Sequence, residues 1–354
     1  MAIVSYPYSD LELDQQAMLY PMLGYLHRDR NLWRVLAQGR FYRHVPITLS
    51  KRLLMRGLQR VMNVPREEFS EKLFQKRLEG FLVASEPKRQ VVLQVGSLRF
   101  PLRKKTRGSG LFQSTFDIPI DLLEQVAPED AVAGGQMNIQ LALHPDSGRG
   151  SPIEGSLFLV PPKGLSIISD IDDTIKRTQV TQKRAMLANT FVHPFQAIEG
   201  MSALYQQWSQ QGAVFHYVSS SPWQIYPAIS EFFAAEQFPA GSMHLRWFRL
   251  RDEIVRKWQI LRRRGKYGIA AGLLKRFSQR QFILIGDSGE RDPEIYSRLA
   301  KRYSNQVAMV VIRQVADHPL EGRRLQKVVQ TMRKIPFMTF EDATELQAID
   351  IASI

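Results

Sequence analysis

The pattern of apolar and polar positions changes along the chain, and its first part mixes an aperiodic stretch with helical spacing. Residues 1–47 are aromatic and mixed, with no clear period. From Thr48, leucine, valine and methionine recur every three or four positions, and four basic residues fall largely on other sides. Pro65 opens the segment "PREEFSEKLFQKRLEGFL", whose proline and acidic residues suit a first helical turn. The pattern therefore predicts two helices, one after Thr48 and one after Pro65.

A set of short runs follows, and several of them alternate between apolar and polar residues as half-buried strands do. In the clearest case, Met137, Ile139 and Leu141 alternate with Asn138 and Gln140. Glycine and proline separate the runs. We expect a small β-rich domain of the sandwich kind that ends near residues 161–164. Its predicted strands are 91–95, 98–102, 111–118, 137–143 and 155–160.

From Gly164 onward, apolar runs alternate with helical segments. The predicted strands are 165–169, 213–219, 281–286 and 307–313, and the predicted helices are about 198–211, 223–236, 266–277 and 292–303. Apolar strands that alternate with helices indicate an α/β fold, a parallel sheet covered by helices on both faces. We expect three parts: a helical and β-rich accessory domain at 1–160, the α/β domain at 161–320, and a helical tail docked on it at 321–354.

Composition narrows the classes of protein that fit. A chain of 354 residues exceeds the usual size of one core, so two domains are expected. With no cysteine, thiolate nucleophiles, disulfides and cysteine metal sites are excluded. No apolar run approaches the roughly 18–20 residues that span a bilayer, and the N-terminus lacks the layout of a signal peptide. We therefore expect a cytoplasmic protein. The net charge of +14 attracts polyanions, either nucleic acid or an anionic membrane surface, unless it serves only solubility.

Three carboxylates follow the first strand of the α/β domain. The segment "LSIISDIDDTIKRT" places Asp170, Asp172 and Asp173 at the carboxyl end of a buried strand, where active sites of open α/β sheets collect. One carboxylate can attack phosphorus, and a second, two residues later, can protonate the leaving oxygen and then activate water. Clustered carboxylates repel one another unless a cation such as Mg²⁺ neutralises them. The alternative is a turn or helix-capping cluster.

Three further elements follow in order. Ser219 lies where the second strand, "YVSSS", leaves the sheet, and its hydroxyl can bond a phosphoryl oxygen or cap the next helix. Lys266 is expected at the start of a helix, where the helix dipole disfavours a cation, so its position suggests that it binds an anion. The alternative is that it is only one lysine of a basic run. Asp287 follows the strand "FILIG" as an expected Mg²⁺ ligand, and Asp292 is a further ligand or a partner of one.

This ordered set resembles the haloacid dehalogenase superfamily of phosphotransferases over roughly residues 160–320. Asp170, Asp172 and Thr174 match its first motif; Ser219, Lys266, and Asp287 with Asp292 match the second, third and fourth. The segments "GLSIISDIDDTIKRT", "FHYVSSSPWQIYP" and "FILIGDSGERDPEIY" are more closely similar to the phosphatidate phosphatase catalytic domain of the fungal actin patch protein and its bacterial relatives, a domain related to the lipins.

The resemblance implies a haloacid-dehalogenase-like fold and Mg²⁺-dependent hydrolysis of phosphatidate to diacylglycerol through an aspartyl-phosphate on Asp170. Asp172 would be the acid and base, Thr174 would shape the turn, and Ser219 and Lys266 would neutralise the transferred group. The metal ligands would be Asp170, the backbone carbonyl of Asp172, and Asp287, with Asp292 as a further ligand or a partner.

Two features suit a lipid substrate held in an anionic membrane surface. Only about 45 residues separate Thr174 from Ser219, and Ser219 from Lys266, which leaves little room for a large cap over the site. The stretch 244–266 interleaves basic residues with Trp247, Phe248 and Trp258, as suits an anionic surface; the alternative is core tryptophans beside a solvated helix face.

Competing functions remain open from the sequence. They are a phosphatase of a soluble ester and a non-catalytic phosphatidate-binding module. Nucleic acid is not expected as a partner because no recognisable motif supports it. The oligomeric state is open too.

Overall fold

The computed structural model describes residues 8–127, 134–149, 151–247, 258–332 and 334–354. The chain divides into two compact units. The first comprises Met1–Pro46 and Leu82–Pro162, and the second comprises Ile47–Phe81 and Lys163–Ile354. Each is described by itself below.

The first unit is built on one nine-stranded sheet. Its main order is β1-β3-β2-β9-β8-β5-β6, while β4 and β7 pair with β3. The pairing is antiparallel except between β2 and β9. One short helix, α3 (Ile120–Glu124), follows β7. The strands are β1 (Gln15–Leu19), β2 (Met22–His27), β3 (Leu32–Arg43), β4 (Ala84–Ser85), β5 (Val92–Val95), β6 (Leu98–Pro101), β7 (Leu111–Pro119), β8 (Gly135–Leu141) and β9 (Glu154–Val160).

The β-rich character predicted for this region is confirmed, and strands β5 to β9 lie where the alternating runs indicated. The strands form one continuous sheet rather than two separately hydrogen-bonded layers. The sequence did not reveal β1 to β3. The reason is visible in β3, whose second half, from Ala37 to Phe41, is buried on both faces, so alternation disappears there.

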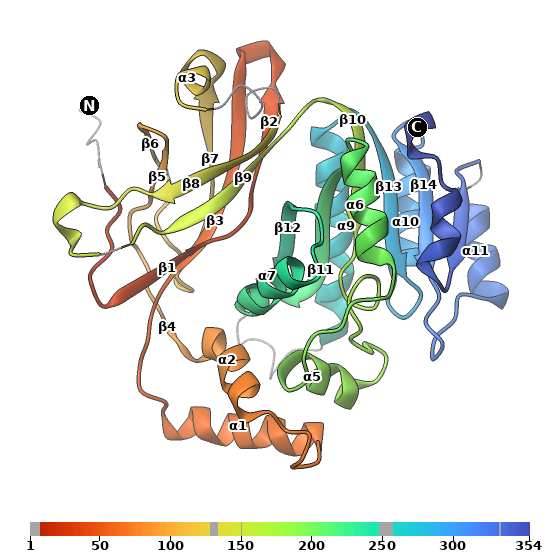
Figure 1. Ribbon diagram of the computed structural model, residues 1–354, viewed down its shortest axis with the longest axis horizontal. Helices are drawn as coiled ribbons and strands as arrows, with labels where there is room; N and C mark the ends of the chain where they lie inside the picture. The colour runs from red at the N-terminus through yellow and green to blue at the C-terminus, as the bar shows by residue number, and fades with distance from the viewer. Residues whose placement is uncertain (1–7, 128–133, 150, 248–257, 333) are drawn as a thin grey trace. The chain divides into compact units, whose positions relative to one another are not determined.

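The second unit contains a six-stranded, fully parallel sheet, which confirms the predicted α/β class (Figure 1). Its order is β12-β11-β10-β13-β14-β15. Four of these strands were predicted; β12 and β15 were not. The strands are β10 (Lys163–Ser169), β11 (Val214–Pro222), β12 (Gly241–Arg246), β13 (Gln279–Asp287), β14 (Val307–Arg313) and β15 (Phe337–Phe340).

Helices join these strands and lie on both faces. Helix α10 packs against α9 and α11 on one face. Helix α6 joins β10 to β11 and α7 joins β11 to β12, in the direction along the sheet opposite to that in which α10 joins β13 to β14. Because such crossovers are right-handed, α6 and α7 lie on the other face. The helices are α5 (Lys183–Phe191), α6 (Met201–Gln210), α7 (Tyr226–Ala235), α9 (Trp258–Arg276), α10 (Asp292–Arg302) and α11 (Gly322–Met332).

The first two helices of the chain, α1 (Leu49–Met62) and α2 (Glu71–Leu82), are grouped with this second unit. The sequence had assigned them to the accessory segment 1–160. Arg77 of α2 donates hydrogen bonds to the backbone carbonyls of Thr190 (3.0 Å) and His193 (2.6 Å), at the end of α5. Lys76 also forms an exposed ion pair with Glu231 of α7 at 2.8 Å. Chain neighbours on both sides of α1 and α2 give no hint of these distant contacts.

The segment after residue 320 was expected to be helical, and this is correct only in part. Helix α11 is followed by strand β15, which pairs in parallel with β14, and then by two short 3₁₀ turns, Ala343–Ala348 and Ile351–Ser353. The run "FMTF" is too short to show a period, and it becomes a strand because the edge of β14 offers unpaired backbone groups. Among the described residues, no helix is both long enough and apolar enough to cross a membrane.

Candidate active site

From β10 the chain adds β11 and β12 on one side of the sheet, and it then adds β13, β14 and β15 on the other side. The predicted residues meet at the carboxyl ends of the neighbouring strands β10 and β13, where this change of direction occurs. Asp170 follows β10, Ser219 lies near the end of β11, and Asp287 ends β13. All seven predicted side chains are buried at this edge. The seven are Asp170, Asp172, Thr174, Ser219, Lys266, Asp287 and Asp292.

Asp170 and Lys266 form the centre of the site. The Asp170 carboxylate is fully buried, and its Oδ1 lies 2.8 Å from the Lys266 Nζ. Its other oxygen accepts a hydrogen bond of 3.3 Å from the Thr174 hydroxyl. Burial raises the pKa of Asp170 well above its usual range, with Lys266 opposing and Asp292 adding to the rise. The lysine ammonium is thus the cation that faces the expected nucleophile.

Lys266 does not begin a helix. Helix α9 begins at Trp258, so the lysine lies in its interior, and the expected opposition to the helix dipole does not apply. Its charge is instead compensated by three carboxylates: Asp170, Asp292 at 2.6 Å and Glu290 at 3.4 Å. Although burial favours the neutral amine, these carboxylates raise the pKa of Lys266 well above its usual value.

Asp172 lies two residues from Asp170 but has different partners. Its Oδ1 is 2.9 Å from the Lys176 Nζ, and its Oδ2 accepts hydrogen bonds from Ser219 (2.7 Å) and Ser221 (2.8 Å). Burial alone would raise the pKa of Asp172, but Lys176 and the two hydroxyls outweigh it and hold the pKa well below the usual range. In this structure Ser219 therefore binds Asp172 rather than an open phosphate position.

Asp173, the third carboxylate of the segment, organises the loop instead of facing the site. Its Oδ1 accepts backbone N–H bonds from Thr178 (2.7 Å) and Gln179 (2.8 Å), and its Oδ2 accepts one from Val180 (2.7 Å). Its own backbone has a positive φ of 57°. The turn interpretation considered for the acidic cluster thus holds for this one aspartate.

Three carboxylates suit a divalent cation: Asp170 follows β10, Asp287 ends β13 and Asp292 begins α10. Carboxylate oxygens of Asp170, Asp287 and Asp292 lie within 4.8 Å of one another. The Oδ2 of Asp287 is buried and has no hydrogen-bond partner among the described residues, whereas its Oδ1 accepts the Glu290 N–H at 2.9 Å. Burial raises the pKa of Asp287 well above its usual range and that of Asp292 to about 6. Mg²⁺ prefers oxygen ligands, and its charge would compensate the carboxylates that Lys266 alone does not neutralise.

Gly286 makes the approach of Asp292 possible. A Cβ atom at this position would lie 2.6 Å from the Asp292 Cβ and closer still to its Oδ2. The glycine before Asp287 therefore lets the first turn of α10 reach the strand end.

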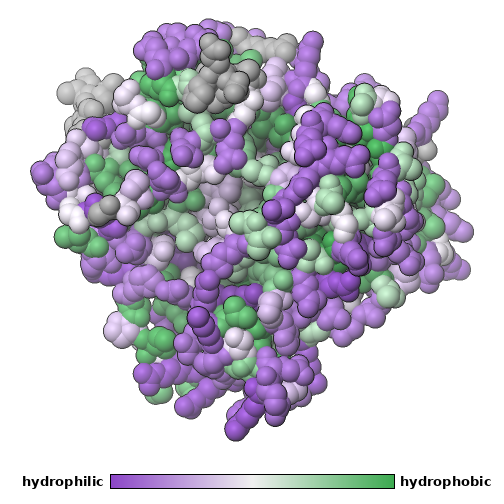
Figure 2. Space-filling model, in the orientation of Figure 1, coloured by the Kyte–Doolittle hydropathy of each residue, from purple (hydrophilic) through white to green (hydrophobic). Residues whose placement is uncertain are grey.

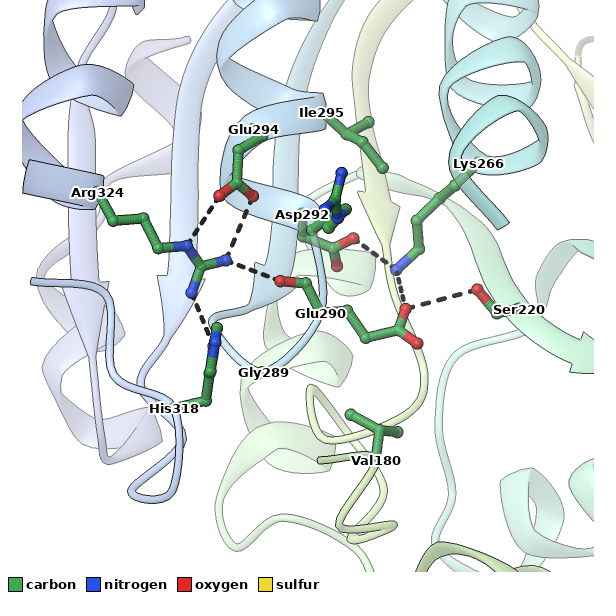
Figure 3. Close-up of a pocket in the computed structure, with 11 residues that line it drawn as sticks. Val180, Ser220, Lys266, Gly289, Glu290, Asp292, Glu294, Ile295, His318 and Arg324 are labelled. Carbon is green, nitrogen blue, oxygen red and sulfur yellow. Dashed lines mark hydrogen bonds and ion pairs between the residues drawn. The ribbon is translucent and has the colours of Figure 1, made fainter. Parts of the chain in front are cut away.

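The structure also adds residues that the sequence did not single out. A cavity of about 470 Å³ opens beside Lys266 and Asp292, and Figure 3 shows Glu290, Arg324 and His318 around it. Arg324 donates to Glu294 (2.8 Å) and to the backbone carbonyl of Glu290 (2.8 Å), so the C-terminal segment holds the loop after β13. The acidic "GERD" pattern could have indicated Glu290; Arg324 and His318 carry no signal in the sequence.

The stretch 244–266, expected to face a membrane, is described only in part. Phe248 and the side chain of Trp258 lie outside the described residues. Trp247 is half-buried, with its ring centroid 5.4 Å from that of Trp223. The membrane role of this stretch remains a prediction.

The part of the chain that carries the site is similar to known proteins. Residues 165–314 match the family model described as "Phosphatidate phosphatase APP1, catalytic domain", so the resemblance found in the sequence is confirmed. Phosphatidate phosphatase APP1 of Saccharomyces cerevisiae is 32% identical over 256 residues, covering 69% of this chain and 41% of the yeast protein. An uncharacterized protein of Schizosaccharomyces pombe is 30% identical over 241 residues, covering 64% and 39%.

The chain thus spans about two fifths of the length of the curated relatives it matches. Among solved structures, phosphoserine phosphatase in its apo form aligns over 53% of this chain and 100% of that chain, with 11% identity and a TM-score of 0.33.

Proposed function

We propose that this chain is a Mg²⁺-dependent phosphatase that converts phosphatidate to diacylglycerol and phosphate, because residues 165–314 match the family model described as the catalytic domain of phosphatidate phosphatase APP1. The observation that carries the proposal is a buried group in which Asp170 contacts Lys266. Beside it lies the Oδ2 of Asp287, which has no hydrogen-bond partner among the described residues. A carboxylate next to a lysine and a candidate cation site is what phosphoryl transfer to an aspartate requires.

The first step would use Asp170 as the nucleophile. A carboxylate oxygen of Asp170 attacks phosphorus, the bond from phosphorus to the glycerol oxygen breaks, and Asp172 supplies a proton to that oxygen. Lys266 balances negative charge on the transferred group, and the Thr174 hydroxyl orients Asp170. Mg²⁺, held by Asp170, the backbone carbonyl of Asp172, and Asp287, with Asp292 beside them, would neutralise phosphoryl oxygens.

The second step regenerates Asp170. Water attacks the phosphorus of the aspartyl-phosphate, and Asp172 takes up the proton. The bond from phosphorus to the Asp170 oxygen breaks, which releases inorganic phosphate. The anionic form of Asp172 that Lys176 and Ser219 hold suits this base role. For the first step, the carboxylate must turn from these partners and bind a proton. Ser219 would then be released to bond a phosphoryl oxygen.

The choice of a lipid substrate rests on the relatives and on charge. The yeast relative is named a phosphatidate phosphatase, and the net charge of +14 favours contact with an anionic membrane surface. We therefore propose peripheral association with such a surface. Nucleic acid is not proposed as a partner, because no recognisable motif supports it.

The decisive experiment measures phosphate release from phosphatidate in mixed micelles, with Mg²⁺ and with chelator, for the wild type and Asp170→Asn. We expect Mg²⁺-dependent release that falls at least about 10³-fold in the variant, since the nucleophile is lost. Retained activity in Asp170→Asn would refute the nucleophile. Release only from soluble esters would refute the lipid substrate, and release from no ester would favour a phosphatidate-binding module.

A further inference from the structure

Helix α1 exposes apolar side chains to an unusual degree. The large apolar residues that are more than about a third exposed number seven among those described, and four of them lie between positions 47 and 61. Leu49 is 74% exposed and Leu53 is 57% exposed. Single exposed leucines are common on soluble proteins, but a cluster on one short helix indicates a surface that binds something.

These leucines do not lie on the side of α1 that packs against its own unit. The packing side consists of Leu54, Met55 and Leu58, which are half-buried, and Met62, which is buried. At 100° per residue, Leu49 and Leu53 point away from that side and stand one turn apart. The outward apolar pair is therefore additional to what the fold requires.

The outward face also carries a strong positive charge. Arg56 and Arg60 fall within about 60° of arc with Leu49 and Leu53 when α1 is projected along its axis. No acidic residue occurs from position 47 to 66. Within the described parts of the chain, neither Arg56 nor Arg60 forms an ion pair, so no protein carboxylate compensates this face. A helix face that combines exposed leucines with arginines lacking ion pairs among the described residues complements an anionic bilayer surface.

The helix is already formed and capped. The Thr48 side chain accepts the Lys51 N–H at its N-terminus, and Asn63 ends it in the left-handed conformation with φ of 50°. A partner that binds this face therefore does not need to induce the helix, which keeps the entropic cost of binding low.

Helix α1 lies on the active-site side of its unit. It contacts α5, which follows the loop that Asp173 organises, and Arg77 of α2 holds the end of α5. Figure 1 shows α1, α2 and α5 beyond the end of the sheet at which β10 runs out toward the site. In Figure 2, apolar and polar residues intermix over the lower part of the same view, where α1 lies.

We infer that α1 is the element that docks this chain on an anionic membrane leaflet, with Leu49 and Leu53 entering the acyl boundary and Arg56 and Arg60 at the depth of the lipid phosphates. The inference deepens the proposed function, because a headgroup in the same leaflet would then lie near the strand ends that carry Asp170. It commits to a lipid surface rather than to a protein or nucleic acid.

The test measures binding of the full chain to vesicles of phosphatidylcholine alone and of phosphatidylcholine with phosphatidylserine, a lipid that is not the proposed substrate. We expect binding only to the anionic vesicles. Leu49→Ser with Leu53→Ser should lower the affinity at least about 20-fold, since two leucines lose their apolar contact. Arg56→Gln with Arg60→Gln should lower it about 25-fold, roughly fivefold for each charge, and weaken its salt dependence.

Matched controls lie on α11 of the same unit. Val329→Ser removes an apolar side chain that is 43% exposed, and Arg323→Gln with Lys327→Gln removes two exposed charges. These variants should bind as the wild type does. All variants should keep the wild-type melting temperature and wild-type turnover of a soluble ester such as p-nitrophenyl phosphate, because none of these residues touches the site.

The possible failures are distinguishable. Binding by the leucine and arginine variants equal to that of the wild type would refute the role of α1 while leaving phosphatase activity intact. Binding that depends on α1 in a chain without phosphatase activity would support the docking helix and refute the enzyme. A wild-type dimer that the leucine variant converts to a monomer, or equal loss in the α11 controls, would also overturn the inference.

Discussion

A single methyl group at Gly286 tests whether the close approach of α10 to β13 builds the site. In Gly286→Ala, the new Cβ would lie 2.6 Å from the Cβ of Asp292. Ordinary contact begins at 3.4 Å, so the first turn of α10 must move by about 0.8 Å, the difference between the two distances. Rotating the Asp292 side chain cannot relieve a clash with its own Cβ. The substitution therefore displaces the carboxylate that lies 2.6 Å from the Lys266 ammonium.

Two effects of this displacement can be estimated. Overpacking a buried position costs about 1–3 kcal/mol of unfolding free energy. A misplacement approaching 1 Å in a catalytic group lowers turnover by about 10²-fold. We therefore expect Gly286→Ala to lose about 10²-fold in kcat and to become less stable, while its substrate KM changes little.

The matched control is Gly268→Ala in α9. Apart from the adjacent residues and the backbone of α9 itself, no described atom lies within 4 Å of a Cβ at Gly268. The same chemical change should therefore stabilise the helix by about 0.5–1 kcal/mol and leave turnover unchanged. Phosphate release gives kcat, and urea unfolding gives stability. Wild-type kcat and stability in Gly286→Ala would refute the view that this glycine is required for the position of Asp292.

Two further predictions concern buried charge. Lys266→Met should abolish phosphate release and lower the free energy of unfolding by about 3–5 kcal/mol at pH 7, because Asp170 and Asp292 lose their buried cation. This loss of stability should become smaller toward pH 5, as the two carboxylates bind protons. A loss that does not change with pH in urea unfolding would contradict this explanation. Burial holds the pKa of His244 at about 4, below its ordinary 6.5, so the unfolded chain binds the extra proton and stability should fall by up to about 3 kcal/mol as pH decreases from 6.5 to 4. A His244→Asn variant should show a shallower decline over this range, and a decline as steep as that of the wild type would contradict the assignment.

Much of the α/β unit could be predicted because its strands are continuous apolar runs. Strands β10, β11, β13 and β14 are buried on both faces, so their sequences stand out without any partner being known. The run that forms β12, "GSMHLR", mixes small, polar and apolar residues, and its strand character comes from pairing with β11. Short edge strands such as β15 have the same origin.

The candidate site shows the same division. The sequence could identify Asp170 and Asp287 because each carboxylate follows a buried strand. It could not show that Ser219 would bond Asp172, or that Lys266 would lie inside a helix. Both facts depend on how loops cross the sheet edge.

The amino-acid sequence alone was enough to predict the parallel sheet, the order of the motifs along it and the types of reactive side chain at its strand ends. Those features are local, because apolar runs and strand-terminal carboxylates are readable without partners. Three features became visible only in the folded chain: which carboxylate is ion-paired to which lysine, how Arg324 holds the loop after β13, and which side of α1 stays exposed. The pair of Asp172 and Lys176 is only four residues apart, but its geometry depends on how the loop after β10 folds. The other contacts join residues far apart in the chain, so long-range packing rather than local pattern sets them.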